Sequence, residues 1–512
     1  RDFMLPIENL YAVDKFRSII TKQGIFYNPN SQQGKYLMTY MYQWGDYLMA
    51  NNGAEMMRNQ MGWTPDQKAF VVGEQEITED GKILPSPTSA LCKGIAKHLL
   101  TSGEYSLWKE AANRLNTPSL ELHAFTMLTG FASVLMCRTS TSGVTLSLTS
   151  ADSGSGKTGA LYAALSIWGN PKELSVVGSG GATDNGLTGR YLGLHNIPFG
   201  LDEVGNMEGK SLSNLVHKIS SGKAKIRMQA SQNAEREHEM SASLIAVFTS
   251  NHSLYNKIEK YKKNASGEAA RLLEFTVRKP KIFVDDPTSG KDIFDPLRDN
   301  YGWAGIEFIQ SLFKLSEPNI KSKFLKWTTK FREDFGDDTT YRFYENAVVT
   351  SFVAGEIAKE AGIIDIDLDR IYSVVMREVI NIKDNIIKPN DTDYESILGE
   401  FINANQTGIL AIEDNKVTME PRTDLIIRAE IDDSNYYIEK RRFRDYLTDG
   451  GISIHDFIFK MKEKGHKIQE RKKRMGAGWK PATGFSSVTS IEINTSKFVD
   501  PDIFKGVKAE TT

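Results

Sequence analysis

The stretch Ala151-Asp-Ser-Gly-Ser-Gly-Lys-Thr158 decides the fold that the sequence predicts for the centre of this chain. It follows an apolar, β-branched run, Val144-Thr-Leu-Ser-Leu148, and it opens a helical stretch that runs from Gly159 to Trp168. A strand, a Gly-rich loop and a helix in this order form the context in which such a loop binds phosphate. Successive backbone N–H groups and the positive end of the helix then face the anion.

This loop predicts a site for ATP and Mg²⁺. Lys157 is expected to reach the β- and γ-phosphates, and Thr158 is expected to ligate Mg²⁺. The other predicted phosphate-binding residues are Ser153, Gly154, Ser155, Gly156 and Gly159. Ala151 stands where the pattern usually has its first Gly. The alternative is a Gly/Ser surface loop, which would leave Gly-Lys-Thr at a strand-to-helix junction unexplained.

The composition is that of an ordinary soluble globular protein, with 512 residues, 40% of them hydrophobic and 25% charged. The net charge of −2 provides no global field that attracts nucleic acid, so any basic surface must be local. Cys92 and Cys137 are far apart, which fits a reducing compartment such as the cytoplasm and supports neither a disulfide framework nor a cysteine metal site.

No membrane segment is expected. The longest apolar stretch, Ala124 to Cys137, is too short to span a bilayer and predicts a buried helix. The first residues lack the apolar region of a signal peptide. Because the chain begins with Arg1 rather than Met, we expect a fragment of a longer polypeptide.

Five segments follow from the periodicity. Residues 1–87 predict an α+β region that includes a hairpin of residues 69–77 and 80–84 with an Asp-Gly turn. Residues 88–142 are helical, residues 143–296 alternate strands and helices as in a parallel sheet, and residues 297–390 are helical again.

The last segment, residues 391–512, predicts a winged helix-turn-helix. Helices over 437–447 and 453–464 flank Gly450-Gly451, and strands follow over 466–474 and 488–493. Two short helices followed by a β-wing are typical of that motif.

Two further strand ends predict the chemistry. Ile197-Pro-Phe-Gly-Leu-Asp-Glu203 is an apolar strand that ends in two carboxylates. Asp202 is expected to hold Mg²⁺, and Glu203 to polarise the attacking water; the alternative is an ordinary acidic strand end. Ser243 to Asn251 is another apolar strand. Asn251 is expected to lie between the phosphate-side strands, where its amide could position the lytic water or sense the γ-phosphate; the alternative is that it caps the following helix.

Arg271 comes just before a third apolar strand. An arginine in this position could point across a subunit boundary and stabilise charge on the transferring phosphoryl group. The alternative is a surface salt bridge to Glu268 or Glu274.

These motifs, Lys157, Asp202-Glu203, Asn251 and Arg271, resemble superfamily 3 helicases within the AAA+ group of viruses and phages. Residues 88–276 also resemble helicase-like ATPase domains of phage and mobile-element proteins, often the C-terminal half of a primase–helicase. The resemblance implies a P-loop AAA+-like core with an N-terminal helical collar. It also implies a homo-hexameric ring on single-stranded DNA, replication partners such as a primase or polymerase, and the host cytoplasm.

In the resembled family, a hairpin between the acidic and Asn-tipped strands grips single-stranded DNA. The matching interval here carries Lys223, Lys225, Arg227, Arg236 and His238. Lys223, Lys225 and Arg227 alternate along a strand, and Arg236 and His238 would occupy the hairpin tip. Interleaved glutamates leave a solvated charged ribbon as the alternative.

The tail is locally basic. Residues 436–480 hold 13 Lys and Arg against 6 Asp and Glu. The predicted nucleic-acid contacts there are Arg442, Lys472 and Arg474, and Tyr436, Tyr437, Phe443 and Trp479 could stack on bases. A solvated face or an intersubunit contact is the alternative.

The sequence therefore predicts an ATP-dependent DNA helicase. An ATP-switched DNA-binding loader that unwinds nothing shares every motif, and a strand-displacement assay would separate the two. A small-molecule P-loop kinase is a third candidate, against which the acidic pair, the Asn-tipped strand and the basic tail argue.

Overall fold

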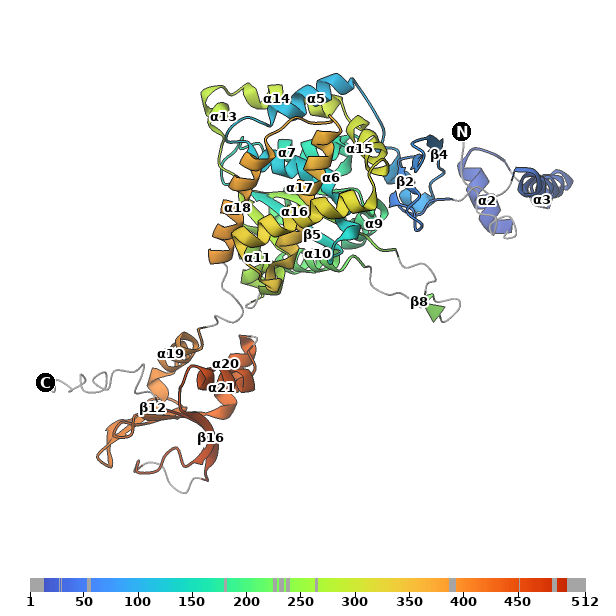
Figure 1. Ribbon diagram of the computed structural model, residues 1–512. Coiled ribbons are helices and arrows are strands. Elements are labelled where there is room, and N and C mark those ends of the chain that lie inside the picture. Colours follow the sequence, from blue (N-terminus) through green and yellow to red (C-terminus); the bar gives the residue numbers. More distant parts are fainter. Residues whose placement is uncertain are drawn as a thin grey trace. The chain divides into compact units, whose positions relative to one another are not determined.

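The computed structural model (Figure 1) describes residues 13–26, 28, 30–52, 57–178, 182–223, 228–229, 234–235, 240–262, 266–385, 393–450, 452–480 and 486–494. The chain divides into two compact units. The larger comprises residues 1–258 and 267–385, and the smaller comprises residues 259–266 and 386–512.

A five-stranded parallel sheet forms the centre of the larger unit. Its strands follow the order β11-β5-β10-β7-β6, and every neighbouring pair runs parallel. The strands are β5 (Gly143–Thr149), β6 (Ser175–Val177), β7 (Phe199–Asp202), β10 (Leu244–Ser250) and β11 (Leu272–Thr276). β5 and β10 are buried along their whole length, as is usual where helices cover a parallel sheet. The predicted mixed α/β architecture with a parallel sheet is confirmed.

The register aligns the carboxyl ends of the central strands. β10 pairs with β5 over its full length and ends with Ser250 opposite Thr149. On the other side of β5, β11 ends with Thr276 opposite the same Thr149. β7 pairs with the middle of β10 and places Leu201 opposite Phe248. The residues that follow β5, β7 and β10 therefore lie at one edge of the sheet.

Helices pack closely around this sheet. They are α4 (Ala90–Ala96), α5 (Tyr105–Arg114), α6 (Glu121–Ala132), η1 (Ser133–Arg138), α7 (Lys157–Ser166), α8 (Pro171–Leu174), α9 (Asp184–Leu194), η2 (Val204–Asn206), α10 (Gly209–Ser221), α11 (Leu254–Tyr261) and α12 (Ser266–Ala269). The predicted helix over 124–137 is α6 and then a 3₁₀ turn. α6 contacts both α7 and α17 (Arg342–Glu360), so it is buried on nearly every side.

The helical segment predicted after residue 297 is present as a set of helices around α17. They are α15 (Trp303–Phe313), α16 (Glu317–Phe335), η3 (Thr339–Tyr341) and α18 (Leu368–Asn385). Two helices precede this set, α13 (Lys281–Asp285) and α14 (Ser289–Asp299), and α14 packs against α5 and α7. Within the described parts of the chain, none of the helices combines the length and apolar character that crossing a membrane requires.

The N-terminal part holds α2 (Val13–Lys22), α3 (Gln32–Asn52) and an antiparallel sheet. That sheet consists of β1 (Gly62–Trp63), β2 (Ala69–Val72), β3 (Gln75–Thr78) and β4 (Ile83–Pro85). The predicted hairpin with an Asp-Gly turn is present between β3 and β4, but its first strand is not continuous, because Gly73 at φ +64° breaks it. Two successive hairpins result, and the second turns at Gly81 with φ +79°.

The smaller unit packs helices against a six-stranded sheet of order β13-β12-β14-β15-β17-β16. Its elements are α19 (Tyr394–Ala404), η5 (Gln406–Gly408), β12 (Ile409–Glu413), β13 (Lys416–Met419), β14 (Ile427–Glu430), β15 (Asn435–Glu439), α20 (Lys440–Asp449), α21 (Ile454–Glu463), β16 (Ile468–Lys473) and β17 (Val488–Asn494). The predicted helix over 437–447 begins later than expected, because Tyr436, Tyr437 and Ile438 form β15, a run of aromatic and β-branched residues that favours a strand.

Helices α6 and α7 lie very close together at Gly130, and this close contact predicts how a substitution there changes stability. A Cβ atom at Gly130 would lie 2.4 Å from the Ala164 carbonyl oxygen, so Gly130→Ala should destabilise the protein by about 1–3 kcal/mol. Gly189, inside α9, has no neighbour within 4 Å of the same position, and Gly189→Ala should stabilise by about 0.5–1 kcal/mol. Chemical denaturation of both variants measures these opposite shifts; equal effects would contradict the packing.

Candidate active site

The loop between β5 and α7 turns through two left-handed glycines. Gly154 has φ +74° and Gly156 has φ +86°, conformations that residues with a Cβ rarely adopt. Ala151, at the usual first Gly position, is not in that left-handed region, so its Cβ creates no backbone strain there. The departure from the pattern at Ala151 therefore imposes no backbone strain on the loop.

Helix α6 supports this loop from below through His123. The His123 ring is buried, and its Nε2 atom lies 2.8 Å from the Ser155 carbonyl oxygen, so Nε2 carries the proton and donates. A Cβ atom at Gly156 would lie 2.7 Å from the same Nε2 atom. Glycine at this position therefore lets the loop sit directly on the imidazole.

Two phenylalanines complete the support. Phe283 and Phe294 pack edge-on or tilted against the His123 ring. A Cβ atom at Gly159 would lie 2.5 Å from the Phe294 ring. The loop and the first turn of α7 consequently rest on a buried aromatic layer.

Lys157 and Thr158 begin helix α7. The Lys157 ammonium donates to the Ser150 carbonyl oxygen at 3.1 Å and to Ser155 Oγ at 3.4 Å. Burial lowers the pKa of Lys157, and the nearby Asp202 and Asp152 carboxylates raise it in part. The ammonium thus lies within the loop, where an anion would improve its solvation.

The hydroxyl of Thr158 joins the loop to the acidic strand β7. Thr158 Oγ1 donates to Asp202 Oδ1 at 3.0 Å, and Thr249 Oγ1 donates to the same oxygen. A hydroxyl and a carboxylate in contact are oxygen donors of the kind that Mg²⁺ prefers. The structure therefore brings the two predicted metal ligands together.

Glu203 follows Asp202 in an unusual backbone conformation. Its φ is +55°, its N–H donates to Thr249 Oγ1 at 3.1 Å, and its side chain is exposed. A non-glycine residue in the left-handed region costs free energy and persists only where the surrounding structure holds it, as it often does at functional sites. The turn directs the Glu203 carboxylate away from the strand and into solvent beside Asp202.

Asn251 lies at the same edge. It follows β10, which lies between β5 and β7, and its side chain is exposed. The preceding Ser250 accepts a hydrogen bond from the His252 N–H at 3.1 Å, which shapes the turn around Asn251. The structure thus places Asn251 between the phosphate loop and the acidic pair.

Arg271 lies at the opposite edge of the sheet. It precedes Leu272, which pairs with Thr145 near the start of β5, about 17 Å along the strand from the phosphate-loop edge. Its guanidinium stacks over the Phe343 ring at 5.3 Å and donates to the Gly267 carbonyl oxygen. No described carboxylate forms an ion pair with it, because Glu268 accepts from Ser213, and Glu274 accepts from Ser253 and Leu254.

Three contributors to the site carry no motif in the sequence. They are His123, Thr249 and Lys279. Lys279 follows β11, and its Cε atom lies 3.9 Å from the position of a Cβ at Gly154, so a second ammonium stands beside the loop. The only sequence signal for Lys279 is its position as a cation just after a buried strand, within Arg278-Lys279-Pro280.

The expected DNA-binding hairpin lies partly within the described residues. β8 (Met228–Gln229) and β9 (Ala234–Glu235) pair antiparallel, and Lys223 forms a bridge with Ser241. Lys225, Arg227, Arg236 and His238 lie outside the described residues. The roles expected for these four residues therefore remain predictions.

In the smaller unit, the prediction that aromatic side chains stack on bases is wrong for three residues. Tyr436, Tyr437 and Phe443 are at most 3% exposed, because β15 and α20 direct them into the domain. Phe459 on α21 is 57% exposed and is the aromatic side chain that this region offers to a ligand. Nothing in its sequence context, Phe-Ile-Phe-Lys, separated it from the buried Phe457.

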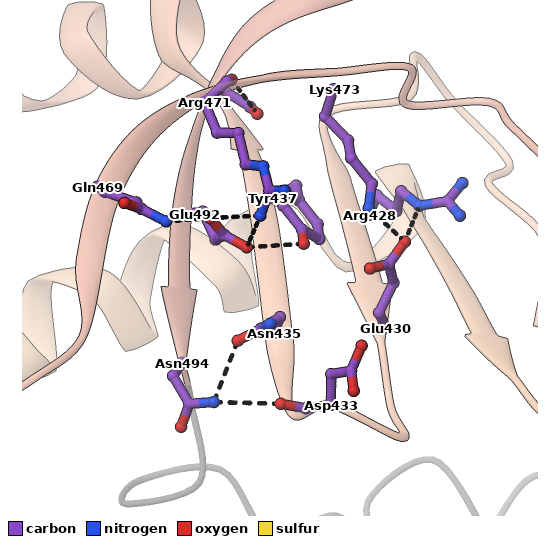
Figure 2. Close-up of polar contacts among 11 residues, drawn as sticks. Arg428, Glu430, Asp433, Asn435, Tyr437, Gln469, Arg471, Lys473, Glu492 and Asn494 are labelled. Carbon is purple, nitrogen blue, oxygen red and sulfur yellow. Dashed lines mark hydrogen bonds and ion pairs between the residues drawn. The ribbon is translucent and has the colours of Figure 1, made fainter.

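A polar network neutralises part of the basic segment (Figure 2). Tyr437, Gln469 and Arg471 all donate to the Glu492 carboxylate. Lys473 pairs with Glu430 at 2.7 Å and lies over the Tyr437 ring at 4.0 Å. Arg471 and Lys473 therefore form contacts within the domain, which makes them less available to a ligand.

The predicted DNA contacts of this unit differ in their availability. Arg442 forms an exposed ion pair with Asp424 at 3.1 Å. Lys472 and Arg474 are exposed, and no described carboxylate forms an ion pair with either of them. Since successive residues of a strand face opposite sides, Lys472 points away from the face that carries Arg471 and Lys473.

Comparisons with known proteins support the architecture. A family model described as "Domain of unknown function (DUF927)" matches residues 6–239. No curated protein matches the sequence. A solved structure described as "SCCmec type IV Cch - active helicase" is similar with a TM-score of 0.62 and 16% identity, over 90% of this chain and 83% of that one. This chain therefore shares the fold of that structure.

Burial of His123 generates a pH prediction. Burial lowers the pKa of His123 to about 4, so below pH about 6.5 the unfolded chain binds a proton that the folded chain does not. His123 therefore supports stability above that pH, and the support is lost as the pH falls toward 4. Between pH 7 and pH 5, wild type should lose about 2 kcal/mol more unfolding free energy than His123→Gln. The exposed His217→Gln, as control, should follow wild type; parallel curves for His123→Gln and wild type would contradict the assignment.

Proposed function

We propose that this chain is an ATP-hydrolysing motor of the AAA+-like helicase class that moves on single-stranded DNA. The observation that carries the proposal is the sheet order, with β10 between β5 and β7. This order gathers the phosphate loop, Asp202, Glu203 and Asn251 at one edge and leaves Arg271 at the other. The shared fold with a structure described as an active helicase supports the same class.

The residues at the first edge fit ATP and Mg²⁺. Backbone N–H groups of the Gly154–Gly156 turn and the start of α7 would bind phosphates, with Lys157 as the charged partner. A side chain at Gly156 would collide with His123 and Phe283 beneath the loop and so displace the turn. Thr158 and Asp202 would hold Mg²⁺, which when bound neutralises phosphate charge.

Hydrolysis then depends on groups that surround the γ-phosphate side. Glu203 accepts the proton of the attacking water, and its exposure leaves room for that water. Asn251 orients the water or the γ-phosphate by hydrogen bonding. Neither role requires movement of the strands, because both residues already follow strands of one parallel sheet.

Arg271 completes a neighbouring site in this proposal. At about 17 Å along the strand from its own loop edge, an arginine side chain cannot reach its own phosphates. Its placement by Phe343 and Gly267 fits delivery to the next subunit of a closed ring, with six subunits as the resembled family implies.

The DNA would contact the hairpin around Lys223 and the basic part of the smaller unit. The order α20, α21 and the β16–β17 pair is that of a winged helix-turn-helix, which we propose for this unit. Lys472, Arg474 and the exposed Phe459 supply phosphate and base contacts there.

A complementation experiment tests the trans arginine. Lys157→Ala should abolish ATP hydrolysis by loss of phosphate binding. Arg271→Ala should lower kcat by about 10³-fold or more while nucleotide affinity stays within a few fold. Mixing the two inactive variants should restore partial activity, because an intact loop then meets an intact arginine across some interfaces. Full turnover by Arg271→Ala alone, or no recovery on mixing, would refute the trans role, and strand displacement by wild type separates a helicase from a loader.

A salt titration tests the DNA contact of the smaller unit. Lys472→Ala should weaken binding to a labelled single-stranded oligonucleotide and reduce the slope of log K against log salt by about 0.7, the loss of one phosphate contact. Lys440, which pairs with Glu470 at 2.7 Å, provides a control of equal charge. Fluorescence anisotropy measures both slopes. Equal losses for Lys440→Ala and Lys472→Ala would indicate a general charge effect instead of a contact.

A further inference from the structure

A glutamate in the sheet binds the start of the helix that follows Asn251. Glu274 lies within β11, and its carboxylate accepts from Ser253 Oγ at 2.6 Å and from the Leu254 N–H at 2.7 Å. Burial raises the pKa of Glu274, and these donors lower it in part. A carboxylate at a helix start satisfies N–H groups that have no partner within the helix.

The same helix, α11, is also tied to the acidic edge. Lys257 Nζ donates to the Gly205 carbonyl oxygen, two residues after Glu203. Gly205 packs against β10, since a Cβ there would lie 2.9 Å from Ser250 Oγ. The first turns of α11 therefore connect β11 to the turn that carries Glu203.

Asn251 lies between these two attachments. Its own side chain is exposed, so its direction follows from the backbone of the short turn between β10 and α11. The Ser250 hydroxyl fixes one end of that turn by bonding His252, and Glu274 fixes the other end at Ser253 and Leu254. Loss of the carboxylate would release only the second end.

We propose that Glu274 is a positioning residue for ATP hydrolysis, which acts by holding the turn that aims Asn251. Because Glu274 is three residues after Arg271 on the same segment, it also links the hydrolytic edge to the arginine-bearing edge. The inference rests on the proposed function and adds to it a residue that touches neither nucleotide nor Mg²⁺.

A double-mutant cycle tests the proposal. Glu274→Ala should lower kcat about 10- to 100-fold through misplacement of Asn251, while affinity for a fluorescent ATP analogue changes less than about twofold. Glu274→Gln should fall between wild type and Glu274→Ala, because its carboxamide oxygen still accepts one hydrogen bond. Asn251→Ala combined with Glu274→Ala should be no slower than the slower single variant, since both changes remove one function.

Control experiments distinguish a failure of the proposed function from a failure of the role of Glu274. Glu356 on α17 is a half-buried carboxylate of similar connectivity, because it binds Lys323, Lys326 and Trp327 of α16. Glu356→Ala should lower Tm without lowering kcat at a temperature where the variant is folded. A wild-type protein without Lys157-dependent hydrolysis would overturn the proposed function itself. Lys157-dependent hydrolysis with an unchanged kcat in Glu274→Ala, or with multiplicative losses in the double variant, would overturn only the role of Glu274.

Discussion

The parallel pairing of β5 with β10 and β11 is the constraint on which the rest of the site depends. Because these strands run in one direction and in register, whatever follows β5 and β10 must meet at one edge. The same pairing forces whatever precedes β11 to the other edge. Ligands of open α/β sheets bind outside the carboxyl ends of the strands for this reason. The separation of Arg271 from the phosphate loop is thus a consequence of topology.

Close packing beneath the loop fixes the position of the loop at that edge of the sheet. Glycines at 156 and 159 leave no space between the loop and its support, so the His123 imidazole and the Phe294 ring touch the backbone directly. The imidazole stays neutral because burial disfavours its charged form, and it donates to the loop as a neutral group. A rigid support of this kind reduces the ordering that phosphate binding would otherwise require.

The parts of the site that are contiguous in the chain were predictable from the sequence. The residues that only the fold brings to the site were not. Lys157, Thr158 and the Asp202-Glu203 pair stand in local strand-to-loop patterns that a reader of the sequence can recognise. His123, Thr249 and Lys279 come from three other segments, and each is an ordinary residue until the fold brings it to the loop. The stacking role of Tyr437 was predicted wrongly, because its side chain is buried and Lys473, from the separate strand β16, covers its ring.

The two edges of the sheet raise the question of how they communicate. The edge with Asn251 also carries the exposed Glu203, and the opposite edge carries the Arg271 guanidinium, which lies over the Phe343 ring. Glu274 joins them, since it lies on the arginine-bearing segment and binds the helix that starts just after Asn251. Tyr344 adds a second restraint, because its hydroxyl donates to the carbonyl oxygens of Ala269 and Leu272 on either side of Arg271. The segment that carries Arg271 is therefore held from two sides, by α17 through Tyr344 and by the start of α11 through Glu274.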